Sequence, residues 1–412
     1  MERKHLVNKG LSVALFLFAF LSYSLVFMTK NCYSAAMAAI VAEGEMTKSQ
    51  TGLLTAVFYL FYAPFQIIGG LAADKISPHK LVALGTFGAA VANLLIYFTQ
   101  NYVAMIIICA ANAIIQFGIW PAIFKIISES LAPSHRVNAV CYIGLAPITG
   151  LLLSYALAVF ISNWKNNFLI SALILFPLAL IFYFAYSGFD RQMIAENTSQ
   201  KEENGEFEDK KHQPILKLLF KSGMPIIFVV YVIHNMLNLG IKAVAPVMLM
   251  ESYKGVSVSL ANAMNLILVA AGVLGVFIAS IKAFGRISQP LLISAYLLLS
   301  LPFLFITAKV GEVNMTCVVV SMAVLMLILS SSATYFLQMS KGFASYGCAG
   351  TVAGILNCMA SVGILLSNYI FTRFSENYGW INTALMWLWL MAVALILCAA
   401  MIPIWKKFKK SA

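Results

Sequence analysis

Long runs of apolar residues without charge fill most of this chain. From Leu11 to Thr29 there are 19 consecutive uncharged residues, and similar runs recur up to residue 404. A helix needs about 20 mostly apolar residues to cross a bilayer, whose interior offers no water to backbone polar groups. The chain is 61% hydrophobic and 10% charged, whereas a soluble protein has about 25% charged residues. Lipid must therefore cover much of its surface.

These runs predict an all-α integral membrane protein with twelve transmembrane helices. Barrel strands would alternate in polarity, whereas these runs are continuous. The first run is longer than the apolar part of a signal peptide, which has about 7–15 residues, so we predict that it is a retained helix. The predicted spans cover residues 11–34, 49–73, 80–98, 102–127, 137–161, 165–187, 224–250, 257–280, 286–307, 313–338, 346–371 and 378–404.

The Lys and Arg residues are distributed unevenly among the loops. With a cytoplasmic N-terminus, 19 of the 27 lie in cytoplasmic segments, five lie on the other side, and Lys30, Lys125 and Lys242 lie within spans. Such a bias in short loops sets the orientation of a membrane protein. Both termini are therefore predicted to be cytoplasmic. The net charge of +12 follows from this topology and does not indicate binding of nucleic acid.

One polar stretch divides the spans into six and six. Residues 188–223 have the composition of a flexible linker, and residues 213–222 are predicted to form a short amphipathic helix on the membrane surface. The predicted domains are an N-terminal six-helix half (1–187), the cytoplasmic linker (188–223) and a C-terminal six-helix half (224–412). Two equal halves are typical of transporters built from parallel repeats.

The loop after the second predicted span carries a motif. Residues 70–80 read GLAADKISPHK, which resembles the G-x-x-x-D-[RK]-x-G-[RK]-[RK] loop signature of the major facilitator superfamily. Gly70, Asp74 and Lys75 match this gating-loop pattern, whereas Ser77 departs from the usual glycine. A glycine permits close helix approach, and an aspartate can face a helix N-terminus or a basic partner. The resemblance implies the major facilitator fold with its two six-helix halves.

Four further stretches, spread over both halves, resemble the organophosphate–phosphate antiporter branch of that superfamily. The resemblance implies a transporter of small phosphorylated metabolites in a bacterial inner membrane, without a cofactor. The stretches are TKNCYSAAM at 29–37, DKISPHKLVALG at 74–85, GIWPAIFK at 118–125 and AGTVAGILN at 349–357.

The chain departs from that branch at the residues expected to bind phosphate. Thr29 and Asn238 stand where the glycerol-3-phosphate transporter has two arginines, Gln66 stands where it has a lysine, and Lys30 is kept. Arginine grips an oxyanion with two hydrogen bonds, whereas lysine is a compact point charge. The resemblance therefore carries over the fold but not the phosphate clamp. The substrate is left open between a phosphate ester and a carboxylate such as a sugar acid.

The lysines within spans point to an anionic substrate. All fifteen Asp and Glu residues lie in predicted loops or at span edges, and a central lysine costs about 2.5–3.5 kcal/mol to insert. Lys30 and Lys242 fall at nearly equivalent places in the two halves, so we predict that both bind the substrate. Lys125 lies near the end of its span and is a weaker candidate. The alternative for each is a structural role, with the ammonium extended to the nearer headgroups.

Other polar residues in the spans are candidates for the same site. A histidine can titrate near neutral pH, so His234 is predicted to couple transport to protons; the alternative is a buried structural histidine. Asn238 lies one turn from Lys242 and shares its helix face. Tyr59, Asn235, Asn265 and Tyr335 are further hydrogen-bonding candidates. The predicted substrate-binding set comprises Thr29, Lys30, Tyr62, Gln66, Trp120, Lys125, Asn238, Lys242 and Asn357.

Three classes of function compete. The first is a secondary transporter that moves a small organic anion by alternating access, through anion exchange or proton coupling. The second is a transporter-like membrane sensor of an anionic metabolite. An enzyme is not expected, because the chain has no HExxH motif, phosphate-binding loop or paired nucleophile and base. We expect no metal or cofactor, a lipid bilayer and a small anion as partners, no nucleic acid, and a monomer.

Overall fold

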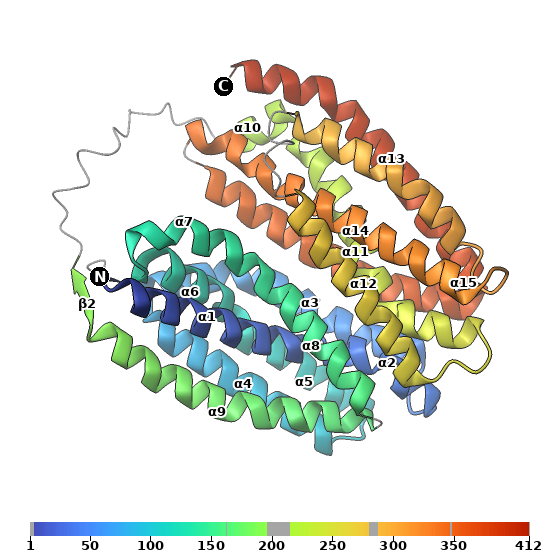
Figure 1. Cartoon of the computed structure of the whole chain (residues 1–412), viewed down its shortest axis with the longest axis horizontal. Coiled ribbons are helices and arrows are strands. Elements are labelled where there is room, and N and C mark those ends of the chain that lie inside the picture. The colour runs from blue at the N-terminus through green and yellow to red at the C-terminus, as the bar shows by residue number, and fades with distance from the viewer. Residues whose placement is uncertain (1–3, 162, 196–214, 280–286, 347, 412) are drawn as a thin grey trace. The chain divides into compact units, whose positions relative to one another are not determined.

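The computed structural model describes residues 4–161, 163–195, 215–279, 287–346 and 348–411 (Figure 1). The chain divides into two compact units. The first contains Met1–Ala36 and Val57–Phe207, and the second contains Met37–Ala56 and Glu208–Ala412. Most of the described residues are helical, which agrees with the predicted all-α membrane fold.

In the first unit, α4 packs along α9 and α1 packs along α8. Two short strands pair in antiparallel fashion, with Lys4 opposite Ala195, and so join the beginning of the unit to its end. The elements are β1 (Lys4–Leu6), α1 (Lys9–Lys30), α4 (Pro78–Phe98), α5 (Tyr102–Ile115), η1 (Gln116–Gly118), α6 (Ile119–Lys125), the π-helical turn η2 (Ile126–Ser130), α7 (Pro133–Tyr142), η3 (Ile143–Leu145), α8 (Ala146–Phe160), α9 (Trp164–Asp190) and β2 (Met193–Ala195).

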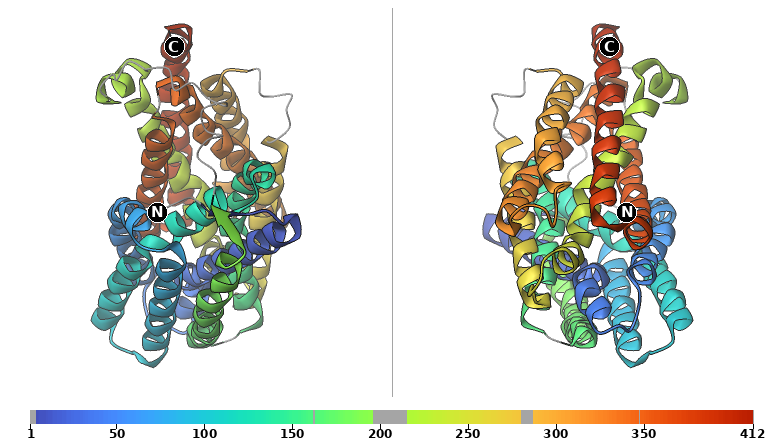
Figure 2. Two further views of the ribbon diagram at one scale, coloured as in Figure 1. Left: turned by 90° about the vertical axis from the view of Figure 1, so that its left-hand side faces the viewer. Right: turned by 90° about the vertical axis from the view of Figure 1, so that its right-hand side faces the viewer.

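In the second unit, α11 packs along α15, and α14 packs against both α12 and α13. The long helices are seen from two sides in Figure 2. The elements are α10 (Ile215–Ser222), α11 (Met224–Ser252), α12 (Val258–Ala279), α13 (Gln289–Thr307), α14 (Met315–Gln338), η6 (Met339–Tyr346) and α15 (Ala349–Ser411). The short helix α10 covers most of the stretch for which an amphipathic helix is predicted.

Two helices contribute to both units. α2 (Cys32–Ala42) follows α1 after a break at Asn31, and α3 (Lys48–Lys75) follows α2. Residues 37–56, which hold the end of α2 and the start of α3, belong to the second unit. Gly52 allows the close approach of α3 and α15, because a Cβ there would lie 2.2 Å from the carbonyl oxygen of Asn368.

Ten helical stretches of the described residues are long and apolar enough to cross a membrane. The first, Lys9–Ala42, joins α1 and α2, and another, Thr351–Lys409, covers the last two predicted spans. These two spans are separated at Gly379, whose φ of 77° interrupts the helix. α3, some of whose side chains lie outside the described part of the chain, lies at the second predicted span and is not among the ten. The count of twelve therefore stays a prediction.

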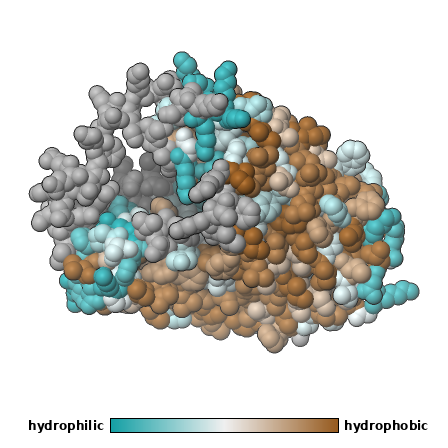
Figure 3. All heavy atoms as spheres, turned by 45° about the horizontal axis from the view of Figure 1, so that its top comes forward, coloured by the Kyte–Doolittle hydropathy of each residue, from teal (hydrophilic) through white to brown (hydrophobic). Residues whose placement is uncertain are grey.

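The surface of the described residues is strongly apolar. Leu84, Ile107, Phe184 and Trp389 expose between 64% and 72% of their area. Figure 3 shows a wide hydrophobic area with hydrophilic residues gathered at its margins. Such an area marks contact with lipid, since soluble monomers rarely expose apolar patches above a few hundred Å². The chain is thus a multi-pass membrane protein.

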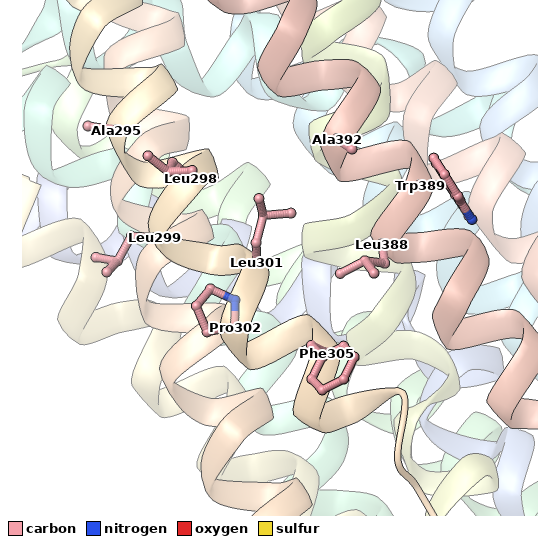
Figure 4. Close-up of a pocket in the computed structure, with 9 residues that line it drawn as sticks. All are labelled: Ala295, Leu298, Leu299, Leu301, Pro302, Phe305, Leu388, Trp389 and Ala392. Atoms are coloured by element: carbon pink, nitrogen blue, oxygen red, sulfur yellow. The ribbon is translucent and has the colours of Figure 1, made fainter.

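An open apolar groove of about 910 Å³ lies between α13 and α15 (Figure 4). Its lining carries no charged side chain, and Trp389 and Phe305 are exposed at its margin. This groove belongs to the lipid-facing surface and offers no group that would bind an anion. It is lined by Ala295, Leu298, Leu299, Leu301, Pro302, Phe305, Leu388, Trp389 and Ala392.

Candidate functional site

Lys30 lies in an aromatic cluster in the first unit. Its side chain is 6% exposed at the last residue of α1, just before the break at Asn31. The ammonium donates to the Tyr62 hydroxyl at 2.8 Å and lies 4.0 Å from the centroid of the same ring. The rings of Tyr23 and Phe27 each lie 5.7 Å from it. These neutral groups stabilise the cation through ring quadrupoles and one hydrogen bond.

Other predicted residues of this unit lie around the Lys30 cluster. Trp120 contacts it through Tyr23, with ring centroids 4.9 Å apart. Gln66 is half-buried on α3, one turn after Tyr62. Thr29 is buried, but its hydroxyl donates to the Val26 carbonyl of its own helix at 2.8 Å. Thr29 therefore satisfies its hydroxyl locally.

Lys242 lies in a polar cluster in the second unit, 5% exposed near the middle of α11. Its ammonium donates to Asn238 Oδ1 at 2.8 Å and to Ser330 Oγ of α14 at 3.4 Å. Ser330 Oγ also lies 3.4 Å from Asn238 Oδ1. The predicted pair on one face of α11 is thus completed by a hydroxyl from a neighbouring helix.

Space for the Lys242 ammonium depends on a glycine of α12. A Cβ at Gly272 would lie 2.8 Å from Ser330 Oγ and 3.1 Å from Lys242 Nζ. Real Cβ contacts are rarely this short, so a larger residue would displace one of these atoms. Gly272 therefore sets where the ammonium sits.

One backbone hydrogen bond of α11 is missing beside the same lysine. Pro246 lies inside the helix and has no N–H, so it cannot bond to the carbonyl four residues earlier, which is that of Lys242. Asn265 of α12 supplies the missing donor, with Nδ2 at 2.9 Å from this carbonyl oxygen. Asn265 is fully buried. The ammonium and the backbone carbonyl of Lys242 thus both bond to side chains of other helices, namely Ser330 of α14 and Asn265 of α12.

His234 is fully buried on α11, one turn before Asn238. Its Nε2 lies 2.7 Å from Ser332 Oγ and 3.0 Å from the Leu329 carbonyl oxygen, both on α14. The rings of Tyr231 and Phe336 pack beside it at 5.9 Å and 5.0 Å. No hydrogen-bond partner for Nδ1 lies among the described residues. His234 therefore links α11 to α14 through one side of its ring.

A third polar cluster lies at the start of α3, within the second unit. Lys48 Nζ pairs with Glu251 Oε2 at 2.7 Å, and Trp380 Nε1 donates to the same oxygen at 2.6 Å. Glu376 accepts from the backbone N–H of Ser49 at 2.7 Å and also from the Ser49 hydroxyl. A carboxylate at the first turn of a helix satisfies an unpaired N–H and complements the helix dipole.

The remaining predicted residues belong to α6, α15 and the last turns of α3. Lys125 ends α6 and is half-buried, and Asn357 is exposed on α15. The backbone of Gly70, Asp74 and Lys75 forms the last turns of α3, but their side chains lie outside the described part of the chain. The described residues contain no group of three or more His, Cys, Asp or Glu residues able to hold a metal ion.

Sequence reasoning missed Tyr23, Phe27, Ser330, Ser332 and Gly272. Two signals were available. Tyr23 lies two turns before Lys30 on α1, and three consecutive serines at 330–332 interrupt an otherwise apolar span. Gly272 has no comparable signal, because its role depends on a side chain that reaches it from another helix.

A comparison with known proteins identifies the family of this chain. Residues 19–368 match the sequence pattern of the Major Facilitator Superfamily. The chain belongs to this superfamily. The predicted recognition is thereby confirmed, and membership of this family agrees with the prediction that the chain is not an enzyme.

The curated relatives of this superfamily member match it over parts of their length. The membrane sensor protein UhpC of Salmonella typhimurium is 31% identical over 99 residues, which are 24% of this chain and 22% of UhpC. A probable hexose phosphate transport protein of Chlamydia trachomatis is 20% identical over 28% of this chain and 26% of its own. The glycerol-3-phosphate transporter of Bacillus subtilis is 23% identical over 40% of this chain and 39% of its own. These alignments span well under half of each relative.

Solved structures share the fold along nearly the whole chain. A bacterial homologue of the human lysosomal transporter Spinster, in an inward-facing and occupied conformation, has a TM-score of 0.76 at 16% identity, covering 97% of this chain and 99% of its own. The nucleoside transporter NupG has a TM-score of 0.68 at 14% identity, covering 96% of this chain and 99% of its own. At these identities the likeness concerns the fold alone.

Proposed function

We propose that this superfamily member is a secondary transporter that moves a small organic anion across the membrane by alternating access. The observation that carries the proposal is a buried lysine within a membrane-spanning helix of each unit, Lys30 and Lys242. Ionisable residues at such places are costly and mark transport pathways. Both ammonium groups bond to neutral side chains, Tyr62 in one unit and Asn238 with Ser330 in the other.

The substrate class that we propose is a phosphate ester or a carboxylate such as a sugar acid. Similarity to proteins named for hexose phosphate and glycerol-3-phosphate supports the phosphorylated class. The absence of arginine at Thr29 and Asn238 favours a different grip on the anion, since lysine binds as a point charge. Anion exchange fits two buried lysines, because the positive charges are left unbalanced within the membrane when no anion is bound.

Exchange in proteoliposomes tests this proposal. Liposomes are loaded with phosphate or with gluconate, and entry of labelled glycerol phosphate, hexose phosphate, gluconate or glucuronate is measured. We expect entry into loaded vesicles, little entry into empty ones, and loss of entry in Lys30→Ala and in Lys242→Ala. Lys309→Ala is the control, because Lys309 is exposed and pairs with Glu312. Wild-type flux in both test variants would refute an electrostatic role.

Similarity to the sensor UhpC favours one second candidate, a membrane sensor of an anionic metabolite. A sensor would bind its ligand and move little of it. Thermal unfolding against the same anions separates the two cases, since a ligand at 100 times its dissociation constant stabilises by about 2.7 kcal/mol. A clear shift in the unfolding temperature without flux in the vesicles would indicate the sensor.

Proton coupling through His234 is a variant of the transporter proposal. The ring is buried and bonds through Nε2 alone among the described residues. Flux that rises with an imposed pH gradient and loses this dependence in His234→Gln would support coupling. We also propose that the protein is a monomer in a bacterial inner membrane and that both of its termini are cytoplasmic. The positive-inside bias supports this orientation of the termini.

A further inference from the structure

The short helix α10 is fixed against the end of α15 in the second unit (Figures 1 and 2). Leu218 and Leu219 are buried in the same hydrophobic core as Trp405 and Phe408. Gly223, with a φ of 74°, turns the chain sharply between α10 and α11. A Cβ at Gly223 would lie 2.4 Å from Met401 Cε, so this turn packs tightly on α15.

The outward side of α10 carries two adjacent stripes. Leu216 and Phe220 are 67% and 72% exposed and lie one turn apart. Lys217 and Lys221 are also exposed and lie one turn apart beside them. Residues four apart share a helix face. An apolar stripe next to a lysine stripe is the pattern of a helix that lies in the interface between headgroups and acyl chains.

Further exposed lysines lie on η6 and on the end of α15, the helix that α10 packs against. η6 packs against the end of α15 through aromatic contacts, with the ring centroids of Phe343 and Phe408 5.2 Å apart. The segments 215–222, 339–346 and 401–409 contain no Asp or Glu. We call the exposed lysines of these segments the lysine rim: Lys217, Lys221, Lys341, Lys406, Lys407 and Lys409.

We propose that the lysine rim, together with Leu216 and Phe220, is a binding surface for the headgroups of anionic phospholipids. The two apolar side chains enter the upper acyl region, and the ammonium groups bind lipid phosphates. Each lysine near an anionic membrane surface is attracted to it, so the rim distinguishes anionic from zwitterionic lipid. Because α10 leads directly into α11, bound lipid fixes the end of the helix that carries Lys242.

Thermal unfolding of the full-length protein in a neutral detergent tests this surface. Phosphatidylglycerol or phosphatidylcholine with identical acyl chains is added, and the unfolding temperature is measured. We expect phosphatidylglycerol to raise it clearly more than phosphatidylcholine does, and added salt to reduce the difference, because exposed charges are screened. Equal shifts with the two lipids, or a difference that salt does not change, would overturn the proposal.

Three pairs of substitutions locate the effect. Lys217→Gln/Lys221→Gln should lose most of the phosphatidylglycerol shift. The matched control, Lys254→Gln/Lys309→Gln, removes two exposed lysines from the loops that follow α11 and α13 and should keep it. A loss of equal size in both lysine pairs would refute the lysine rim as the site. Leu216→Gln/Phe220→Gln should weaken the shift as well, and an unchanged shift would refute the role of the apolar pair.

Discussion

The carbonyl of Lys242 gives a sharp test of how the second unit is held together. Pro246 frees this carbonyl and Asn265 donates to it at 2.9 Å. Asn265→Leu removes the donor while filling a similar volume, so the carbonyl is left buried without its partner. Pro246→Ala restores a backbone N–H that can bond to the same carbonyl. The substitution at Asn265 should therefore cost less when Ala occupies position 246.

The size of this coupling can be worked from the contact. An unsatisfied buried acceptor costs about 1–3 kcal/mol, whereas interhelical hydrogen bonds measured in a membrane protein average about 0.6 and reach about 1.7 kcal/mol. We expect a coupling free energy of about 1–2 kcal/mol between the two positions. With about 2–4 °C per kcal/mol for 150–250 residues, the cost of Asn265→Leu should shrink by roughly 2–8 °C in the Pro246→Ala background.

The assay is thermal unfolding of four purified proteins: wild type, each single variant and the double variant. Asn262→Leu is the control, since Asn262 is buried on the same helix one turn earlier, and its effect should add to that of Pro246→Ala. The reasoning would be refuted if Asn265→Leu lowered the unfolding temperature equally with Pro and with Ala at position 246.

Three further predictions concern the other contacts. Glu376→Gln should lower the unfolding free energy by about 1–2 kcal/mol, because the acceptor at the start of α3 loses its charge. Glu312→Gln, in an exposed ion pair, should change the unfolding free energy little. Equal effects of the two substitutions in thermal unfolding would contradict a stabilising role of Glu376. Gly272→Ala should weaken binding of the transported anion about tenfold, or by about 1.4 kcal/mol, because it displaces the Lys242 ammonium. Gly354→Ala is the control and should bind the anion normally, because Gly354 has open space around it. The two variants are compared by ligand-induced thermal shift, and equal affinities would exclude the displacement. Tyr62→Phe removes the oxygen that accepts from Lys30 but keeps the ring, so it should reduce flux less than Lys30→Ala does. Flux is measured by vesicle uptake, with Tyr59→Phe as the control. Wild-type flux in Tyr62→Phe would show that the hydrogen bond to Lys30 has no role in transport.

The fold could be predicted from sequence because its main signal is local. A bilayer demands uncharged runs of about 20 residues, and each predicted span coincides with helix in the described residues. The start of α3 has a contact that hydropathy does not predict, because the backbone N–H of Ser49 donates to Glu376, 327 residues later in the chain.

The candidate site was predictable where its contacts are local and not where they are tertiary. Lys242 and Asn238 lie one turn apart, so helix geometry joins them. Ser330 and Gly272 lie beside the same ammonium but on other helices. The sequence of their own spans does not show which residue of a neighbouring helix they will face. Thr29 was included because it stands where the resembling transporter has an arginine; its hydroxyl bonds to Val26 of its own helix, and its role in the site stays a prediction.

The cluster at the start of α3 has a consequence for biosynthesis. Ser49 and Glu376 are 327 residues apart in the chain, and ribosomes add about 5–20 residues per second. The first turn of α3 is therefore made about 16–65 s before the carboxylate that caps it. During that interval the segment from residue 37 to residue 56 has to stay in or near the membrane without the helices it will pack against. The second unit is begun early and completed last, so a chain that stops before α15 leaves it unfinished.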